Sequence, residues 1–186
     1  MITIDKLKSP KADVSVLFVL QKDEHGIVDS KFIDAEILNF VNKELKENNR
    51  TFFAFNKITN WLIVAVVETV EAEYKNVETL RKLGGKLLDF CDNEYIKHLQ
   101  LISGLPKKET MGFVEGMLLA SYTFDAYKTD PKKCIHPFDK LSLVHQEIEI
   151  KDIEELLIIA RAVEKCKDLV NEPYCGLNAE GLASAF

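Results

Sequence analysis

The first half of the chain alternates apolar runs with stretches in which apolar residues recur at helical spacing. Residues 14–20 are β-branched and apolar, which predicts a buried strand that ends in a polar turn. Residues 32–45 carry apolar residues on one helical face, which predicts an amphipathic helix ended near Asn48. Residues 51–55 and 61–68 predict two further strands, and the short connection between them predicts an antiparallel hairpin.

The second half continues this alternation. A helix is predicted over residues 77–91, a strand over residues 96–102 and an unusually apolar helix over residues 110–124. Residues 141–150 alternate only loosely, so we expect a strand at an edge of the sheet. A long helix is predicted over residues 152–171, begun by Asp152 with Glu155 three residues later. Strands alternating with helices, one pair being antiparallel, predict an α/β fold around a mixed sheet.

Small residues interrupt two of the predicted helices. Gly84 and Gly85 lower the helix propensity of their segment, which indicates a close packing contact there. Gly112, Gly116 and Ala120 are four residues apart and form one stripe, along which a strand or another backbone can approach closely. We expect the helix that carries this stripe to lie against the sheet.

Composition limits the classes of protein that the chain can belong to. Its 186 residues suit one ordinary domain, and 24 Lys and Arg against 30 Asp and Glu leave a net charge of −6. This charge argues against nucleic-acid binding, since no basic segment interleaved with aromatic residues offsets it. The longest apolar run, residues 61–67, is too short to cross a bilayer as a helix, and residues 1–6 lack a secretory pattern. We therefore expect a cytoplasmic protein without a membrane partner.

The cysteines and histidines predict no metal site and no disulfide. Cys134 and His136 are two possible ligands, but a tetrahedral site needs four and the sequence shows no second pair. No cysteine has C-x-x-C spacing, so all four are expected as unpaired thiols. The isolated histidines and the cysteines are His25, His98, His145, Cys91, Cys134, Cys166 and Cys175.

A loop and a carboxylate each have a functional and a structural interpretation. Ser103, Gly104, Leu105 and Pro106 lie between a strand and a helix, where backbone N–H groups can bind an anion, but they also suit an ordinary turn and form no phosphate-binding motif. Glu115 is the only charge within residues 110–124 and is a candidate acid–base carboxylate. Because catalysis needs a second positioned group, we expect Glu115 to be a structural residue at the rim of the sheet, hydrogen-bonded or paired with Lys128.

The aromatic residues that follow also have a functional and a structural interpretation. They could form a stacking platform for a ligand, but aromatic residues that close a helix onto a core are commoner. No nucleophile elbow is present either, so the residues alone favour a non-catalytic domain. These aromatic residues are Tyr122, Phe124 and Tyr127.

The C-terminal residues predict the start of another helix. Asn178 is a good N-cap residue, and eight residues follow it. A helix shorter than about 12 residues is marginal in water unless something packs on it. We therefore expect a second domain to pack on this helix.

Three segments, taken in order, resemble the leucyl (cytosol) aminopeptidase family, which comprises hexameric metallopeptidases that remove N-terminal residues from peptides. Residues 115–129 resemble the family pattern E-G-x-x-L-x-x-Y-x-F-D-x-Y-K. Residues 160–173 resemble the linker helix that ends in R-D-L-V-N-x-P, and residues 177–183 resemble L-T-P-E-x-L-A at the entry to the catalytic domain. The likeness covers essentially the whole chain and is strongest after Gly112.

This resemblance implies a fold and a division into domains. The family's N-terminal domain is similar to a macro domain, with a helix layer, a mixed sheet and a second helix layer. The implied division is an accessory domain over residues 1–150, a linker helix over residues 151–173 and the start of a catalytic domain over residues 174–186. Lys167 stands where the family usually has Arg, and residues 67–68 stand where a Gly-Leu-Gly turn is common.

The resemblance also implies where the chemistry lies. In the family, two divalent metal ions, commonly zinc or manganese, and the catalytic Lys and Arg belong to the C-terminal domain. Ala179, Glu180 and Gly181 lack the flanking Asp and Arg of the metal-binding motif N-T-D-A-E-G-R, so no catalytic, cofactor-binding or metal-binding residue is assigned to this chain. The implied function is a non-catalytic domain of a metallo-aminopeptidase, which packs on its own catalytic domain and contributes to a hexamer.

Two other functions remain open from the sequence. The chain could be a free-standing macro-like module that binds ADP-ribose or a related phosphorylated nucleotide near residues 103–106. It could also be a purely structural oligomerisation domain. In the aminopeptidase interpretation, peptide substrate is expected to bind elsewhere than on this segment.

Overall fold

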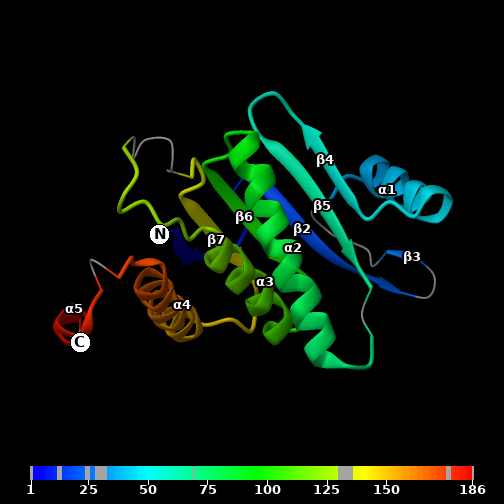
Figure 1. The fold of residues 1–186 in the computed structure, drawn as a ribbon. Coiled ribbons are helices and arrows are strands. Elements are labelled where there is room, and N and C mark those ends of the chain that lie inside the picture. Colours follow the sequence, from blue (N-terminus) through cyan, green and yellow to red (C-terminus); the bar gives the residue numbers. More distant parts are fainter. Residues whose placement is uncertain are drawn as a thin grey trace.

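The computed structural model describes residues 2–11, 14–23, 26–27, 33–68, 70–129, 136–174 and 177–185 (Figure 1). The strands are β1 (Thr3–Lys6), β2 (Ser15–Asp23), β3 (Gly26–Ile27), β4 (Phe52–Asn56), β5 (Trp61–Val67), β6 (His98–Ser103) and β7 (Lys140–Val144). The helices are α1 (Ala35–Asn48), α2 (Glu73–Asn93), α3 (Lys107–Ala120), α4 (Ile150–Asn171) and α5 (Ala179–Ala185). This order of elements confirms the predicted α/β class.

The strands form one mixed sheet. Its order is β1-β7-β6-β2-β5-β4, in which the first five strands are parallel to one another. β4 is antiparallel to β5, as the short connection predicts, and β3 pairs antiparallel with β2 off this path. The hairpin therefore forms one edge of an otherwise parallel sheet.

Helices cover both faces of the sheet (Figure 1). Leu17 and Val19 of β2 belong to the core under α2 and α3, whereas Phe18 and Leu20 belong to a second core under α1, because successive strand residues face opposite sides. β5 is buried on both faces, which explains its unbroken apolar run. The predicted three-layer arrangement of helices, mixed sheet and helices is confirmed.

The two helices on one face, α2 and α3, pack backbone against backbone. A Cβ atom on Gly84 of α2 would lie 2.2 Å from the carbonyl oxygen of Phe113, and one on Gly116 of α3 would lie 1.9 Å from the carbonyl oxygen of Arg81. A side chain does not fit at either position, so glycine permits this approach. The small-residue stripe thus faces a neighbouring helix, and the predicted close contact is confirmed.

The strand predicted over residues 141–150 differs from the structure in length and in position. β7 ends at Val144 and lies between β6 and β1, so the prediction of an edge strand is wrong. The edge belongs to β1, whose residues pair with β7 from Thr3 opposite Lys140 to Lys6 opposite Leu143. The sequence pattern did not reveal β1, because it has only four residues and two of them are charged.

Several helices begin or end elsewhere than predicted. α4 begins at Ile150 because Glu149 is its N-cap residue, and the backbone N–H of Glu149 donates to Asp152 Oδ2 at 2.7 Å in a capping box. α2 starts earlier than predicted, at Glu73. α3 ends at Ala120, which leaves residues 121–129 as a loop rather than the last turn of a helix.

Some sequence predictions lie outside the described residues. These are the ones that involve His25, Phe32, Cys134 and Cys175. The described helices include none with the length and the apolar character that a membrane span requires.

Candidate functional site

Two of the segments that carry the family resemblance lie against each other. In the loop after α3, the Tyr122 hydroxyl donates a hydrogen bond to Asp168 Oδ1 of α4 at 2.8 Å and accepts one from Asn171 Nδ2 at 3.1 Å. Farther along the loop, the Tyr127 hydroxyl donates to Glu172 Oε2 at 2.5 Å. The loop is thereby fastened to the C-terminal end of the long helix.

Lys167 adds a third connection, from α4 to the end of α3. Its Nζ donates to the Leu119 carbonyl oxygen at 3.0 Å and lies 4.9 Å from the centre of the Tyr122 ring. A cation at the carboxyl end of a helix satisfies a terminal carbonyl and is favoured by the helix dipole. Lysine can therefore serve where the family usually has arginine. We call Tyr122, Tyr127 and Lys167, with their partners, the clamp.

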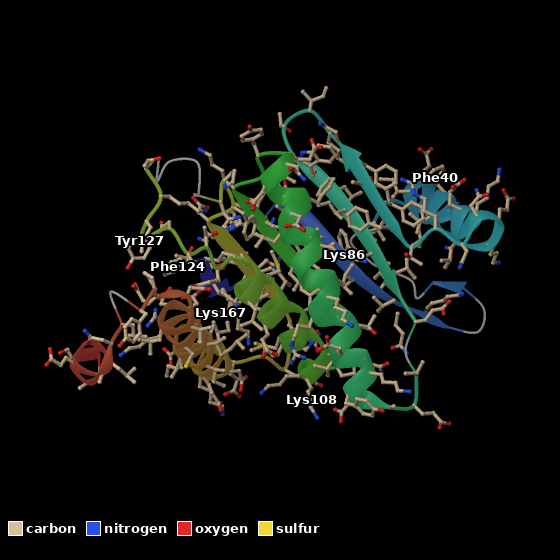
Figure 2. All side chains as sticks on the ribbon, viewed as in Figure 1. Phe40, Lys86, Lys108, Phe124, Tyr127 and Lys167 are labelled. Carbon is tan, nitrogen blue, oxygen red and sulfur yellow. The ribbon has the colours of Figure 1, made fainter. Side chains whose placement is uncertain are left out.

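The aromatic residues of this loop have a different role from the one expected. The rings of Phe124 and of the clamp residue Tyr127 lie 5.9 Å apart and are tilted by 50°, on the side of the molecule that carries Lys167 (Figure 2). Tyr127 is exposed rather than buried in the core. The loop therefore closes onto α4, and the tyrosine hydroxyls make the specific contacts.

Glu115 is hydrogen-bonded to and paired with Arg81 of α2, so the predicted structural role holds with Arg81, rather than Lys128, as the cation. Arg81 Nη2 and Nε lie 2.6 and 3.1 Å from Glu115 Oε2, and Arg81 Nη1 lies 2.7 Å from Glu78 Oε2. Hydrogen bonds to Glu115 and then to Glu78 raise the pKa of the Arg81 guanidinium. The sequence could not show this partner, because 34 residues separate the two side chains. The pair joins α2 to α3 and supports the structural interpretation of Glu115.

A cavity of about 470 Å³ lies beside the clamp. On its wall, His136 Nδ1 contacts the Asp92 carboxylate and His136 Nε2 lies 3.2 Å from Thr123 Oγ1, while Asp92 Oδ1 accepts the Phe138 N–H at 3.2 Å. A carboxylate, an imidazole and a hydroxyl in this order can activate a nucleophile. The other walls, however, carry carboxylates, which oppose the oxyanion of acyl transfer. These wall carboxylates are Asp125, Asp139, Glu164 and Asp168.

We therefore interpret this group as a structural link between the end of α2 and the segment that leads into β7. Sequence reasoning considered His136 only as a metal ligand. It missed Asp92 and Thr123, since each belongs to a different element and no local spacing connects them.

A second cavity, of about 860 Å³, lies at the carboxyl ends of β1, β6 and β7 and includes residues 103–106. Ligands of open α/β sheets bind at such strand ends. The loop groups are already engaged, because Ser103 Oγ lies 2.8 Å from Thr110 Oγ1 and accepts the Leu105 N–H at 3.2 Å. His145 is engaged too, with Nε2 2.9 Å from the Leu105 carbonyl oxygen. The loop is thus an internally bonded turn that borders the cavity.

The other titratable side chains are dispersed. Among the described residues, no cluster of three or more His, Cys, Asp or Glu side chains could hold a metal ion. Cys91 is buried and Cys166 is exposed, and burial, with a smaller effect of Asp92, raises the pKa of the Cys91 thiol to about 12. Ala179, Glu180 and Gly181 form the first turn of α5, where Asn178 Oδ1 accepts the Gly181 N–H at 2.9 Å and acts as the predicted N-cap.

Comparison with known proteins finds a similarity in sequence to one aminopeptidase and a similarity in fold to another. A probable cytosol aminopeptidase of Clostridium perfringens (strain 13 / Type A) is 33% identical over 75 residues, which are 38% of this chain and 15% of that protein. A tomato leucine aminopeptidase mutant has the same fold, with a TM-score of 0.74 over 99% of this chain and 41% of that chain, at 12% identity. The resemblance to the leucyl aminopeptidase family is confirmed.

A second solved structure with this fold is the bottromycin maturation enzyme BotP. The TM-score is 0.62 over 92% of this chain and 36% of the BotP chain, at 18% identity. No protein-family model matches the chain. The chain thus spans less than half the length of each of these three proteins, and the structural likenesses show a shared fold.

Proposed function

We propose that this chain is the non-catalytic N-terminal domain of a metal-dependent leucyl aminopeptidase that releases N-terminal amino acids from peptides. Residues 1–150 would form the accessory domain, residues 151–173 the linker helix and residues 174–186 the start of the catalytic domain. The contact between Tyr122 and Asp168 carries this proposal, because it joins two of the family-like segments.

The clamp gives this domain a defined task. The Tyr122 and Tyr127 hydroxyls bond to side chains at the C-terminal end of α4, and the ammonium of Lys167 in α4 bonds to the Leu119 carbonyl oxygen of α3. A helix held at this end has a fixed direction relative to the sheet. A catalytic domain attached beyond the helix would therefore be presented in one orientation.

The family resemblance implies both the metal ions and the oligomeric assembly of this proposal. Zinc or manganese in the catalytic domain would polarise the scissile carbonyl and activate the attacking water. No residue of this chain is proposed as a ligand or as a catalytic group. The accessory domain would contribute to domain packing and to a hexamer.

Hydrolysis of leucine amide tests the proposal. The complete protein that contains this chain is expected to release leucine when manganese or zinc is added and to lose activity with a chelator. A fragment that ends at Pro173 is expected to release none, because it lacks the proposed catalytic domain. Metal-dependent turnover by that fragment, after contaminant controls, would contradict a non-catalytic role.

The second candidate function is a module that binds ADP-ribose. The cavity at the carboxyl ends of β1, β6 and β7 favours it, since its position and volume suit a nucleotide. Titration calorimetry with ADP-ribose decides between the two functions. Binding that is weakened by Lys6→Ala, at the rim of this cavity, would support it, and no heat at millimolar ligand would remove it.

A further inference from the structure

The long helix α4 has two apolar faces, and the described domain uses one of them. Ile153, Leu156 and Ala160 are buried against the core. On another side, Ile158 is 65% exposed, Ile159 is 49% exposed and Val170 is 83% exposed. We call this second set the outer stripe, and its members are Ile158, Ile159, Ala162, Val163, Cys166 and Val170.

The outer stripe is continuous along the helix. Its members recur at intervals of three or four residues, which places them in one line on a helix surface. They line a shallow groove of about 570 Å³ together with Lys167 and Asn171. Large apolar side chains gathered on a protein surface mark an interaction site more often than scattered ones do.

We propose that the outer stripe is the surface on which the catalytic domain of the same chain docks. This inference rests on the proposed function, which supplies that domain. It goes further by assigning the face of α4 that the domain covers, whereas the clamp fixes the direction in which α4 points.

The size of the stripe favours a tethered partner over a second copy. From Ile158 to Val170 the helix rises about 18 Å, and its width is about 10 Å. A stable complex between separate proteins buries about 800 Å² on each partner, which this strip cannot supply alone. A domain on the same chain has an effective concentration in the millimolar range, so a small apolar strip suffices to hold it.

The outer stripe also has a fixed place on the accessory domain. At the start of α4, Lys107 Nζ of α3 lies 2.7 Å from Asp152 Oδ2, and near its end Lys167 Nζ reaches the Leu119 carbonyl oxygen of α3. The Lys107 ammonium lowers the pKa of the Asp152 carboxyl, which keeps this carboxyl charged. A domain docked on the stripe would therefore be held in register with the sheet.

Cys166 lies within the outer stripe, so the reactivity of its thiol shows whether the stripe is covered. In the complete protein, maleimide modification is measured at each cysteine by peptide mass spectrometry. We expect Cys166 to react slowly, because a docked domain would bury its thiol, and Cys91 to stay unmodified as a buried internal control. A Cys166 rate equal to that of a small free thiol would overturn the inference.

A matched pair of variants separates docking from folding. Ile158→Asp places a charge on the stripe, whereas Ile150→Asp places one at a residue that is 64% exposed and outside it. Ile158→Asp is expected to raise the Cys166 rate by about tenfold, because it opens access to the thiol. Ile150→Asp should leave the rate unchanged, and unmodified Cys91 in both shows an intact core. Equal rates in the two variants would contradict the assignment.

Leucine amide hydrolysis by the same samples distinguishes the failure of this inference from that of the proposed function. Activity with a fully reactive Cys166 overturns the docking and leaves the function standing. Protection without activity overturns the function. In that case, Cys166 protection that is lost on dilution to a monomer assigns the stripe to a second copy and overturns the docking. Cys166 protection that persists at every dilution supports a cover from the same chain.

Discussion

Gly84 and Gly116 occupy positions where two helix backbones approach each other directly. Gly84→Ala would force a methyl group against the Phe113 carbonyl, which a Cβ atom would approach to 2.2 Å. Overpacking costs about 1–3 kcal/mol, more than the gain of up to about 1 kcal/mol that alanine brings to a helix. We therefore expect Gly84→Ala to lower the free energy of unfolding, measured by urea denaturation.

Gly85 is the matched control for this substitution. Its Cβ position lies 3.5 Å from the Ala120 Cβ, an ordinary contact, so Gly85→Ala keeps the packing and gains helix propensity. It should leave the protein unchanged or more stable. Equal destabilisation by the two variants would show that the backbone contact is not the cause.

His98 makes the stability of the domain depend on pH. Burial, together with the Lys140 charge, lowers the pKa of the imidazole, whose Nε2 lies 2.8 Å from Ser142 Oγ. The unfolded state binds a proton more readily, so this contribution is present above pH about 6.5 and is lost as the pH falls through the lower folded pKa. We expect the free energy of unfolding to fall from pH 7 to more acid conditions less steeply in His98→Gln. Parallel curves for the two proteins would contradict this.

At the scale of elements, the clamp is expected to suppress opening of the end of α4. Tyr122→Phe removes the hydrogen bonds to Asp168 and Asn171, which are exposed to solvent and therefore contribute only weakly. Amide hydrogen exchange should become faster in the last turns of α4, and the core of α3 should be unaffected. Tyr74→Phe, at an exposed tyrosine of α2, is the control and should change neither.

The sequence predicted most of the elements, because their signals are local. The apolar run of β5 and the helical spacing in α1 and α2 depend on neighbours within one or two turns. β1 was not predicted, because Asp5 and Lys6 interrupt its apolar pattern and because its pairing with β7 joins residues more than 130 positions apart. That missing strand is also the reason why β7 was predicted at an edge.

The candidate site was less predictable, because its contacts join distant elements. Tyr122 and Tyr127 were recognised as aromatic residues of interest, but their partners in α4 lie some 45 residues away. Arg81 for Glu115 and Asp92 for His136 are similarly distant. Only the order of the family-like segments pointed to this region, and it did so without indicating that two of them touch.

At the scale of the whole molecule, Gln100 ties the N-terminal segment to the middle of the sheet. Its buried amide accepts the Lys11 N–H at 2.6 Å and donates to the Lys11 carbonyl oxygen at 2.7 Å. Gln100→Met would leave both backbone groups without these partners, at a cost of about 1–3 kcal/mol. We expect a lower thermal midpoint, whereas Gln146→Met at an exposed position should have little effect. A midpoint unchanged in both variants would contradict the role of Gln100.

The two ties between α3 and α4 have a mechanical consequence. Lys107 with Asp152 and Leu119 with Lys167 join the two helices at points about 18 Å apart along α3 and about 23 Å apart along α4. Two helices connected at two separate points resist sliding and rotation relative to each other, whereas a single connection would allow one helix to rotate about it. A force on the C-terminal end of α4 is therefore transmitted to α3, and through the glycine contacts of α3 to α2. We thus expect α4 to move together with the domain rather than as a hinge.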